Sequence, residues 1–431
     1  MLGIGKGEYF VASDASALLA HTKQIVYLDD GEIAVLTPEK HQIYETRSRK
    51  MIEKEVQEID WTVEQAQKGG YPHFMLKEIF EEPEAVENSI RGRMVKESGI
   101  ARLGGLRDAE DKLKDAKRIL ISACGTAAFA GRIGEYLFEE CAGIPAKIDV
   151  ASEFRYRSPV FQKGDIFLAI SQSGETADTL AALREAKKAG IPTLGIVNVV
   201  GSTIARETDA GVYQHVGPEI GVASTKAFTS QVALLTLFAL MLGRARGMSR
   251  GHGQKILDQL SRIPEAMRNI LQQNNAVQKL AQKYQYAENF FFLGRKYNLP
   301  VAYEGALKLK EVSYVHAEGY GAGEMKHGPI AMIHENFPSV CIAPQDSVYE
   351  KMLSNIQELK ARRGPIIAIA TEGDENMKDL ADDIIFIPRT LEILNPLLAV
   401  VPLQLFAYHF GVLRGYDVDK PRNLAKSVTV E

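Results

Sequence analysis

Apolar runs alternate with amphipathic stretches along most of the chain from Arg118 onward. Residues 166–170 are continuously apolar, which is typical of a strand buried on both faces. The following residues 177–188 place Leu180, Leu183 and Ala186 at helical spacing, with basic residues opposite. Strands that alternate with helices in this way predict a parallel sheet with helices on both faces, an α/β fold. The predicted strands are 119–121, 146–150, 166–170 and 192–197.

The same pattern occurs a second time. A run of aromatic residues ends at Gly294, 169 positions after Gly125, and Gly364 opens a further apolar run 174 positions after Gly190. So small a drift in the offset predicts a duplicated domain. We assign the two copies to residues 106–250 and 251–415.

The ends of the chain differ from this pattern. Residues 8–12 and 24–36 predict short antiparallel strands, with Asp30-Gly31 as the turn of a hairpin, and 41–45 predict one more. So few strands bury too little surface for a domain of their own. We therefore interpret residues 1–46 as the end of a larger β-rich domain, followed by a helical linker at 47–105. A tail at 416–431 closes the chain.

Composition narrows the function classes. The 431 residues carry a net charge of −4, which does not favour nucleic acid or an anionic membrane as a partner. The three cysteines are scattered without metal-ligand spacing, which fits a reducing cytoplasm. We find no signal-peptide pattern, and the longest apolar stretch, 232–242, is too short to span a bilayer. We expect a cytoplasmic protein with no metal and no cofactor.

Two polar turns predict an anion site. Residues 171–176, Ser-Gln-Ser-Gly-Glu-Thr, lie between a predicted strand and a helix N-terminus, where free N–H groups and the helix dipole favour a phosphate. A second turn at 124–126 also follows a strand, so both turns should face one crevice at the carboxyl edge of the sheet. An ordinary, well-capped strand–helix connection would produce the same local pattern, and this alternative stays open.

Candidate reactive groups lie in the second copy and in the tail. Glu304, Lys308 and Glu311 share one helix face among apolar neighbours, an arrangement that can tune a proton-transfer group. His327 follows a glycine-rich loop and could act as an acid or base. Lys426 could form a Schiff base with a carbonyl substrate. The alternatives are a surface ladder of charges, a structural histidine and a solvated lysine.

Four segments carry a wider resemblance: residues 171–179, 219–226, 304–311 and 422–431. Together they resemble the glutamine–fructose-6-phosphate aminotransferase family over nearly the whole chain. The resemblance implies two tandem sugar-isomerase (SIS) domains, preceded by the end of an N-terminal-nucleophile glutaminase domain. It further implies that fructose 6-phosphate is aminated at C2 and isomerised to glucosamine 6-phosphate. That reaction is the first step of hexosamine and UDP-N-acetylglucosamine synthesis.

The resemblance also assigns roles. It makes Lys426 the Schiff-base lysine, Glu311 the base that moves a proton between C1 and C2, and Lys308 the cation that stabilises enolate charge. It makes His327 the ring-opening histidine, supplied by the neighbouring subunit of a homodimer. The substrate-binding residues that it implies are Thr126, Ser171, Gln172, Ser173, Thr176, Val222, Ser224 and Glu304.

Two positions depart from the family pattern. Leu2 stands where the family has its glutaminase cysteine, so we expect this chain alone to use free ammonia, whereas the full-length enzyme takes nitrogen from glutamine. Ala127 replaces a usual serine, which removes one hydroxyl from the phosphate site. Two other functions stay open: a deaminating or deglycating SIS enzyme, and a non-catalytic sugar-phosphate-binding regulator.

Overall fold

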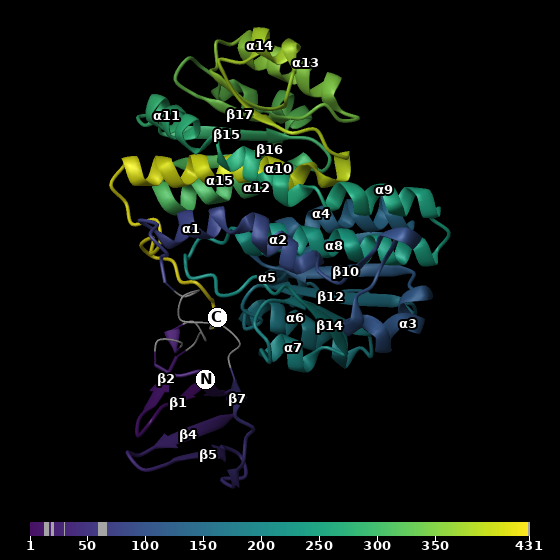
Figure 1. Cartoon of the computed structure of the whole chain (residues 1–431), viewed down its shortest axis with the longest axis vertical. Helices are drawn as coiled ribbons and strands as arrows, with labels where there is room; N and C mark the ends of the chain where they lie inside the picture. The colour runs from purple at the N-terminus through teal and green to yellow at the C-terminus, as the bar shows by residue number, and fades with distance from the viewer. Residues whose placement is uncertain (13–16, 19–20, 30, 59–66, 430–431) are drawn as a thin grey trace.

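The computed structural model describes residues 1–12, 17–18, 21–29, 31–58 and 67–429. Figure 1 shows three parts along the long axis of the molecule: the N-terminal strands at one end, a first α/β unit, and a second α/β unit at the other end. The C-terminus returns to the region between the N-terminal strands and the first α/β unit.

The first unit contains a five-stranded parallel sheet in the order β11-β10-β12-β13-β14. Alternate residues of β12 enter different cores: Ile166 and Leu168 pack with α4 and α8, whereas Phe167 packs with α6. The sheet is therefore covered on both faces, as predicted. Its strands are β10 (Arg118–Ala123), β11 (Ala146–Val150), β12 (Asp165–Ser171), β13 (Thr193–Val197) and β14 (Ala210–Tyr213). Its helices are α3 (Glu110–Lys114), α4 (Gly125–Ala142), α5 (Ala151–Phe154), α6 (Ala177–Lys188), α7 (Thr203–Glu207) and α8 (Lys226–Ala245).

The second unit repeats this topology, with the strand order β16-β15-β17-β18-β19, again parallel throughout. The predicted duplication is thus confirmed at the level of strand order. Its strands are β15 (Asn289–Gly294), β16 (His316–Gly321), β17 (Ser339–Ala343), β18 (Ile366–Thr371) and β19 (Asp383–Ile387). Its helices are α12 (Asn298–Ser313), α13 (Tyr349–Lys360), α14 (Glu375–Leu380) and α15 (Asn395–Leu413).

One hydrophobic core joins the two units. Side chains of α4 and α8 from the first unit and of α12 and α15 from the second belong to the same buried cluster. Figure 1 shows these four helices between the two sheets. The helices α9 (Arg250–Leu260), α10 (Ile263–Leu271) and α11 (Asn274–Tyr284) connect the units.

The predicted N-terminal hairpin is wrong. β3 (Gln24–Val26) pairs with β1 (Leu2–Ile4) and β7 (Gln57–Glu58), whereas β4 (Glu32–Leu36) pairs with β5 (His41–Glu45) in a separate sheet. Adjacent residues of β3 are buried in two different clusters, so this strand is covered on both faces and lies between two neighbours. Asp30 of the expected turn lies outside the described residues. The remaining strands of the two sheets are β2 (Tyr9–Val11) and β6 (Met51–Ile52).

The N-terminal sheets extend beyond the boundary expected at residue 46. β6 and β7 belong to the N-terminal sheets, so strands continue to residue 58 and the segment 47–105 is not wholly helical. Its helices are α1 (Phe74–Phe80) and α2 (Glu82–Ile90), and the short strands β8 (Met94–Val95) and β9 (Ile100–Ala101) follow.

Two helices among the described residues, 226–245 and 392–413, are long and apolar enough to cross a membrane by length and composition. Both exceed the apolar stretch expected from the sequence. Most of each lies buried in the core that joins the two units, which accounts for their hydrophobicity.

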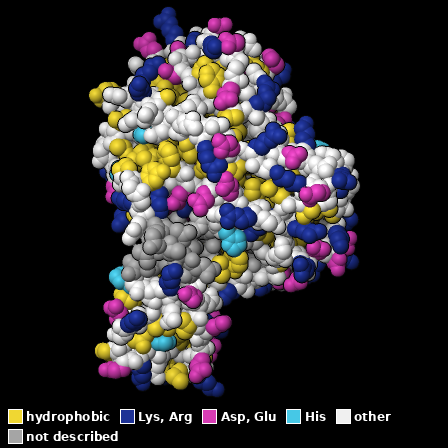
Figure 2. Space-filling model, in the orientation of Figure 1, with side chains coloured by type: hydrophobic (Ala, Val, Ile, Leu, Met, Phe, Trp, Pro, Cys, Tyr) yellow, Lys and Arg dark blue, Asp and Glu magenta, His cyan; other side chains and the backbone are white. Residues whose placement is uncertain are grey.

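On the face shown in Figure 2, acidic and basic side chains are interspersed rather than gathered by sign.

Candidate active site

The polar turn after β12 has the predicted form. The Ser171 hydroxyl accepts from the Gly174 N–H (2.9 Å) and shares a hydrogen bond with the Thr176 hydroxyl (3.0 Å). The Ser173 hydroxyl accepts from the Glu175 N–H at 3.2 Å. Gly174 adopts φ +69°, and a Cβ there would lie 2.0 Å from the Ser202 hydroxyl, so the turn requires glycine. The carbonyl of Gln172 accepts from the Asn198 N–H, which ties the turn to the end of β13.

The C-terminal tail lies on this turn. The Val428 carbonyl accepts from the Ala177 N–H, the first amide of α6 (3.1 Å). The Ser427 hydroxyl donates to the Ser173 hydroxyl at 3.2 Å. The tail therefore covers the place where the sequence predicts a phosphate.

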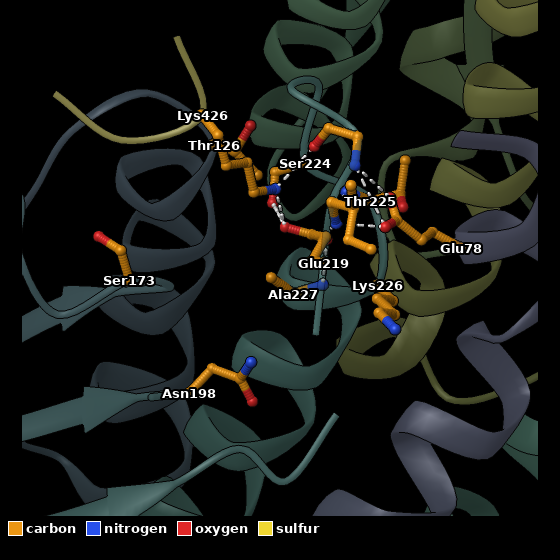
Figure 3. A network of polar contacts seen from close by, with 12 residues as sticks. Glu78, Thr126, Ser173, Asn198, Glu219, Ser224, Thr225, Lys226, Ala227 and Lys426 are labelled. Carbon is orange, nitrogen blue, oxygen red and sulfur yellow. Dashed lines mark hydrogen bonds and ion pairs between the residues drawn. The ribbon is translucent and has the colours of Figure 1, made fainter. Parts of the chain in front are cut away.

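Lys426 is held beside the turn by a second segment of the first unit. Its ammonium group lies 2.6 Å from the Glu219 carboxylate and 2.9 Å from the Gly221 carbonyl oxygen. Figure 3 shows the Lys426 side chain reaching from the tail toward Glu219. Since only 14% of the lysine side chain is exposed, the alternative of a solvated tail lysine does not describe it.

Glu219 organises this corner. Its side chain is fully buried and accepts from the Ser224 hydroxyl (2.7 Å), the Thr225 N–H (2.9 Å) and the Ala227 N–H (3.1 Å), so it caps α8 as well as pairing with Lys426. Burial alone would raise the pKa of Glu219. The charge of Lys426 and these hydrogen bonds outweigh burial and lower the pKa to about 2. Glu219 thus faces the lysine as a carboxylate at neutral pH.

Glu304, Lys308 and Glu311 form a cluster on one face of α12, as predicted. The Lys308 ammonium lies 2.8 Å from Glu311 and 3.4 Å from Glu304, and it donates to the Thr126 hydroxyl at 3.0 Å. Thr126 in turn donates to Glu304 at 3.2 Å. Since Thr126 belongs to α4 of the first unit, the cluster joins the two copies. Glu304 and Lys308 are fully buried, so the alternative of a surface charge ladder is wrong for them.

Burial and the neighbouring charges shift the pKa values of Glu304 and Lys308. Burial raises the pKa of Glu304 to about 7, although Lys308 pulls that pKa down. Burial alone would lower the pKa of Lys308, but Glu304 and Glu311 outweigh it and raise the pKa above its usual value. Lys308 is therefore a fixed cation, and Glu304 can hold or release a proton near neutrality.

Of the other predicted site residues, Val222 and Ser224 lie on the loop that carries Glu219. The Val222 N–H donates to the Asp419 carbonyl of the tail (3.0 Å). His327 is exposed at the end of the short helix Ala322–His327, and no described hydrogen bond or ion pair joins it to Lys426 or to the α12 cluster. Within one chain, His327 therefore has no described polar contact with these site residues.

Sequence reasoning missed two acids. Glu219 was part of a recognised motif, but no spacing pattern distinguished it, because its partner Lys426 is 207 positions away. Glu78 lies in the segment predicted as a helical linker, yet it is buried and accepts from the Ile220 and Gly221 N–H groups. Among the described residues, no group of three or more His, Cys, Asp or Glu could hold a metal ion.

Comparison with known proteins matches this geometry to a family. The SIS domain model matches residues 112–241 and 283–414. The glutamine–fructose-6-phosphate aminotransferase of Chlorobaculum tepidum is 54% identical over all of this chain, which covers 70% of that protein. The chain belongs to the glutamine–fructose-6-phosphate aminotransferase family. An enzyme of that name from Thermus thermophilus is 51% identical over the whole chain and is covered to 71%.

Solved structures agree with this family membership. The C-terminal domain of the Francisella tularensis glucosamine-fructose-6-phosphate aminotransferase has a TM-score of 0.78 and 39% identity, and the match covers 82% of this chain and 100% of that one. A glucosamine-6-phosphate deaminase from Thermotoga maritima has a TM-score of 0.64 at 22% identity, covering 82% of this chain and 99% of that one. The deaminase shares the fold alone. This aminotransferase-family chain thus has two SIS domains, each a parallel sheet between helices, behind a β-rich N-terminal region.

Proposed function

We propose that the chain converts fructose 6-phosphate and ammonia to glucosamine 6-phosphate through a Schiff base on Lys426. One observation carries the proposal: adjacent tail residues contact both halves of the site. Lys426 pairs with Glu219, while Ser427 touches Ser173 of the polar turn. A ketone bound by its phosphate at this turn would have an amine beside it.

The polar turn supplies the phosphate site. Ser171, Ser173 and Thr176 offer hydroxyl donors at the N-terminus of α6, where the helix dipole favours an anion. The side chain of Gln172 adds an amide donor, and Val222 and Ser224 close over the sugar from the opposite loop. The phosphate is then bound by local donors, which suits a protein of net charge −4.

Glu219 serves the covalent step. Lys426 must lose a proton before its amine can attack the C2 carbonyl, after which water leaves and a protonated imine forms. The imine and the ammonium group carry the same positive charge, so the buried Glu219 carboxylate stabilises both. Ammonia then replaces the lysine at C2, which returns the free amine.

The α12 cluster serves the proton transfer. Glu311, whose side chain is 20% exposed, is the base that moves a proton between C1 and C2. Lys308 stays charged and stabilises the negative charge that develops on the enolate oxygen of the sugar. Glu304 accepts from Thr126 of the first unit and, with its pKa about 7, can share a proton with the bound sugar.

His327 completes the proposed site from a neighbouring subunit. It is exposed, and no described hydrogen bond or ion pair joins it to Lys426 within its own chain, so it is available to the site of a second copy. We therefore propose a homodimer. We also propose a cytoplasmic location, supported by three cysteines that are all free.

The test supplies fructose 6-phosphate and ammonium to the chain and measures glucosamine 6-phosphate. We expect product from the wild type, none from Lys426→Met, and unchanged product from Lys420→Met, which alters an exposed lysine of the same tail. Sugar binding without conversion would instead identify a sugar-phosphate-binding regulator. Release of ammonia from glucosamine 6-phosphate, with no forward reaction at saturating ammonium, would identify a deaminating enzyme.

A further inference from the structure

The short helix α1 meets the Glu219 loop on the side opposite Lys426. Its residue Glu78 is 1% exposed. One carboxyl oxygen of Glu78 accepts from the Ile220 N–H at 2.5 Å and from the Gly221 N–H at 3.2 Å. These are the residues that directly follow Glu219, so Glu78 fixes the backbone of the loop that holds the lysine. Figure 3 shows Glu78 and Lys426 on opposite sides of this loop.

Gly221 is the point where the two sides meet. Its N–H donates to Glu78, and its carbonyl accepts from the Lys426 ammonium at 2.9 Å. A Cβ on this residue would lie 2.8 Å from the Glu78 carboxylate and 3.5 Å from the backbone of Met75. No larger residue fits there without moving Glu78. The peptide is therefore held between the helix and the lysine.

The same helix also holds the base of the tail. The carboxylate of Asp419 accepts from the first two amides of α1, those of Phe74 and Met75, each at 2.9 Å. The carbonyl of Asp419 accepts from the Val222 N–H. Hydrogen bonds thus join α1 to the loop, α1 to the tail, and the loop to the tail. Lys426 lies farther along the same tail.

Burying a carboxyl group at this position destabilises the folded chain, and packing alone does not explain why an acid is found there. Burial and the nearby Glu219 charge raise the pKa of Glu78 to about 8, although Lys426 and Lys226 oppose them. An apolar side chain would avoid this cost. What only an acceptor can do here is bind the two loop amides.

We propose that Glu78 is a positioning residue for the reaction of Lys426: by binding the amides of residues 220 and 221, it places Glu219 and the Gly221 carbonyl where they hold the lysine toward the sugar. The inference rests on the proposed function. It extends the site to a helix outside both segments that match the SIS model. Since Glu78 does not touch the polar turn, its loss should affect turnover rather than sugar binding.

The test compares Glu78→Ala, Glu78→Gln and Gly221→Ala in the ammonium-dependent assay. We expect Glu78→Ala to lower kcat by roughly 10- to 100-fold, because misplacing a reacting group by about 1 Å costs a factor of that order. KM for fructose 6-phosphate should stay within about threefold. Glu78→Gln should be intermediate, since its carbonyl oxygen can still accept from both amides while its NH₂ group, in place of the second carboxyl oxygen, faces the Gly221 N–H. Glu82→Gln is the control, a fully buried acid four positions on that is not among the acceptors of the loop amides.

A double variant separates positioning from loss of structure. If Glu78 acts through Gly221, then Gly221→Ala should lower kcat in the wild type but add little in Glu78→Ala, where no carboxylate remains to be displaced. Borohydride trapping of the fructose 6-phosphate adduct provides a second readout, and the trapping rate should fall in parallel with kcat. Additive losses, an unchanged trapping rate in Glu78→Ala, or a raised KM with normal kcat would each overturn the inference. Absence of any adduct in the wild type would instead contradict the proposed function itself.

Discussion

Replacing Lys308 by methionine tests the electrostatics of the α12 cluster. Methionine keeps the length and apolar stem of the side chain but removes the ammonium, which is 1% exposed and contacts Glu304, Glu311 and Thr126. Glu304 would then keep only the Thr126 hydroxyl as a described donor. Removing one partner of a buried ion pair typically costs about 3–5 kcal/mol, because the other charge stays buried and unpaired. We expect a loss of that size in the free energy of unfolding at about pH 9.

The loss should depend on pH. The pKa of Glu304 is about 7 in the wild type, and without Lys308 it must rise further. A carboxyl group whose pKa is higher in the folded than in the unfolded protein stabilises the fold at low pH, and this contribution falls as pH rises between the two pKa values. Between pH 7 and the raised pKa of Glu304 in the variant, the variant should therefore lose about 1.4 kcal/mol per pH unit relative to the wild type.

Urea unfolding followed by circular dichroism at pH 6, 7.5 and 9 measures this difference. Lys310→Met on the exposed face of the same helix is the matched control and should change stability by no more than about 0.5 kcal/mol. Glu304→Gln combined with Lys308→Met should remove the extra pH dependence, since no buried acid remains at that position. A loss below about 1 kcal/mol at pH 9, or equal losses at pH 6 and pH 9, would show that Lys308 does not stabilise a buried Glu304 carboxylate.

Three further predictions concern the phosphate site and stability. Ser173→Ala should raise KM for fructose 6-phosphate roughly 5- to 10-fold with little change in kcat, because one hydroxyl hydrogen bond contributes about 1 kcal/mol; an unchanged KM would exclude Ser173 from sugar binding. Ala127→Ser should lower KM several-fold by adding a hydroxyl to the phosphate site, and isothermal titration with the sugar checks the same gain in the absence of turnover. Burial lowers the pKa of His409 to about 4, so its neutral form stabilises the fold above about pH 6.5 and this contribution is lost as pH falls toward 4. Thermal unfolding between pH 7 and 5 should show a smaller acid loss in His409→Gln than in the wild type, whereas the exposed His252→Gln should match the wild type.

The sequence predicted most of the α/β fold because its strands are buried on both faces. Such strands appear as unbroken apolar runs, and β12 differs from the predicted 166–170 by one residue at each end. The second copy was predicted because matching residues of the two copies lie at similar separations, 169 and 174 positions. The N-terminal hairpin failed because Asp30-Gly31 is a local turn pattern, whereas the pairing of β3 depends on strands that are distant in sequence.

The same division holds in the site. Glu304 and Lys308 were found because a helix places residues four positions apart on one face. Their contacts with Thr126 span 178 positions for Glu304 and 182 for Lys308, and have no local pattern. Glu78 and Glu219 were missed for this reason: each is defined by a partner far away along the chain, at a separation of 142 positions for Glu78 and 207 for Glu219. A single glutamate in a loop or on a helix is usually a surface residue.

The most direct test of the proposed Schiff base is to find the lysine that binds the sugar. The chain is incubated with fructose 6-phosphate, reduced with borohydride and digested, and the peptides are analysed by mass spectrometry. We predict one modified residue, Lys426, carrying a reduced hexose phosphate, and no modification when inorganic phosphate occupies the polar turn in excess. Modification of Lys308 or of another lysine instead of Lys426, in a chain that forms glucosamine 6-phosphate, would contradict this prediction.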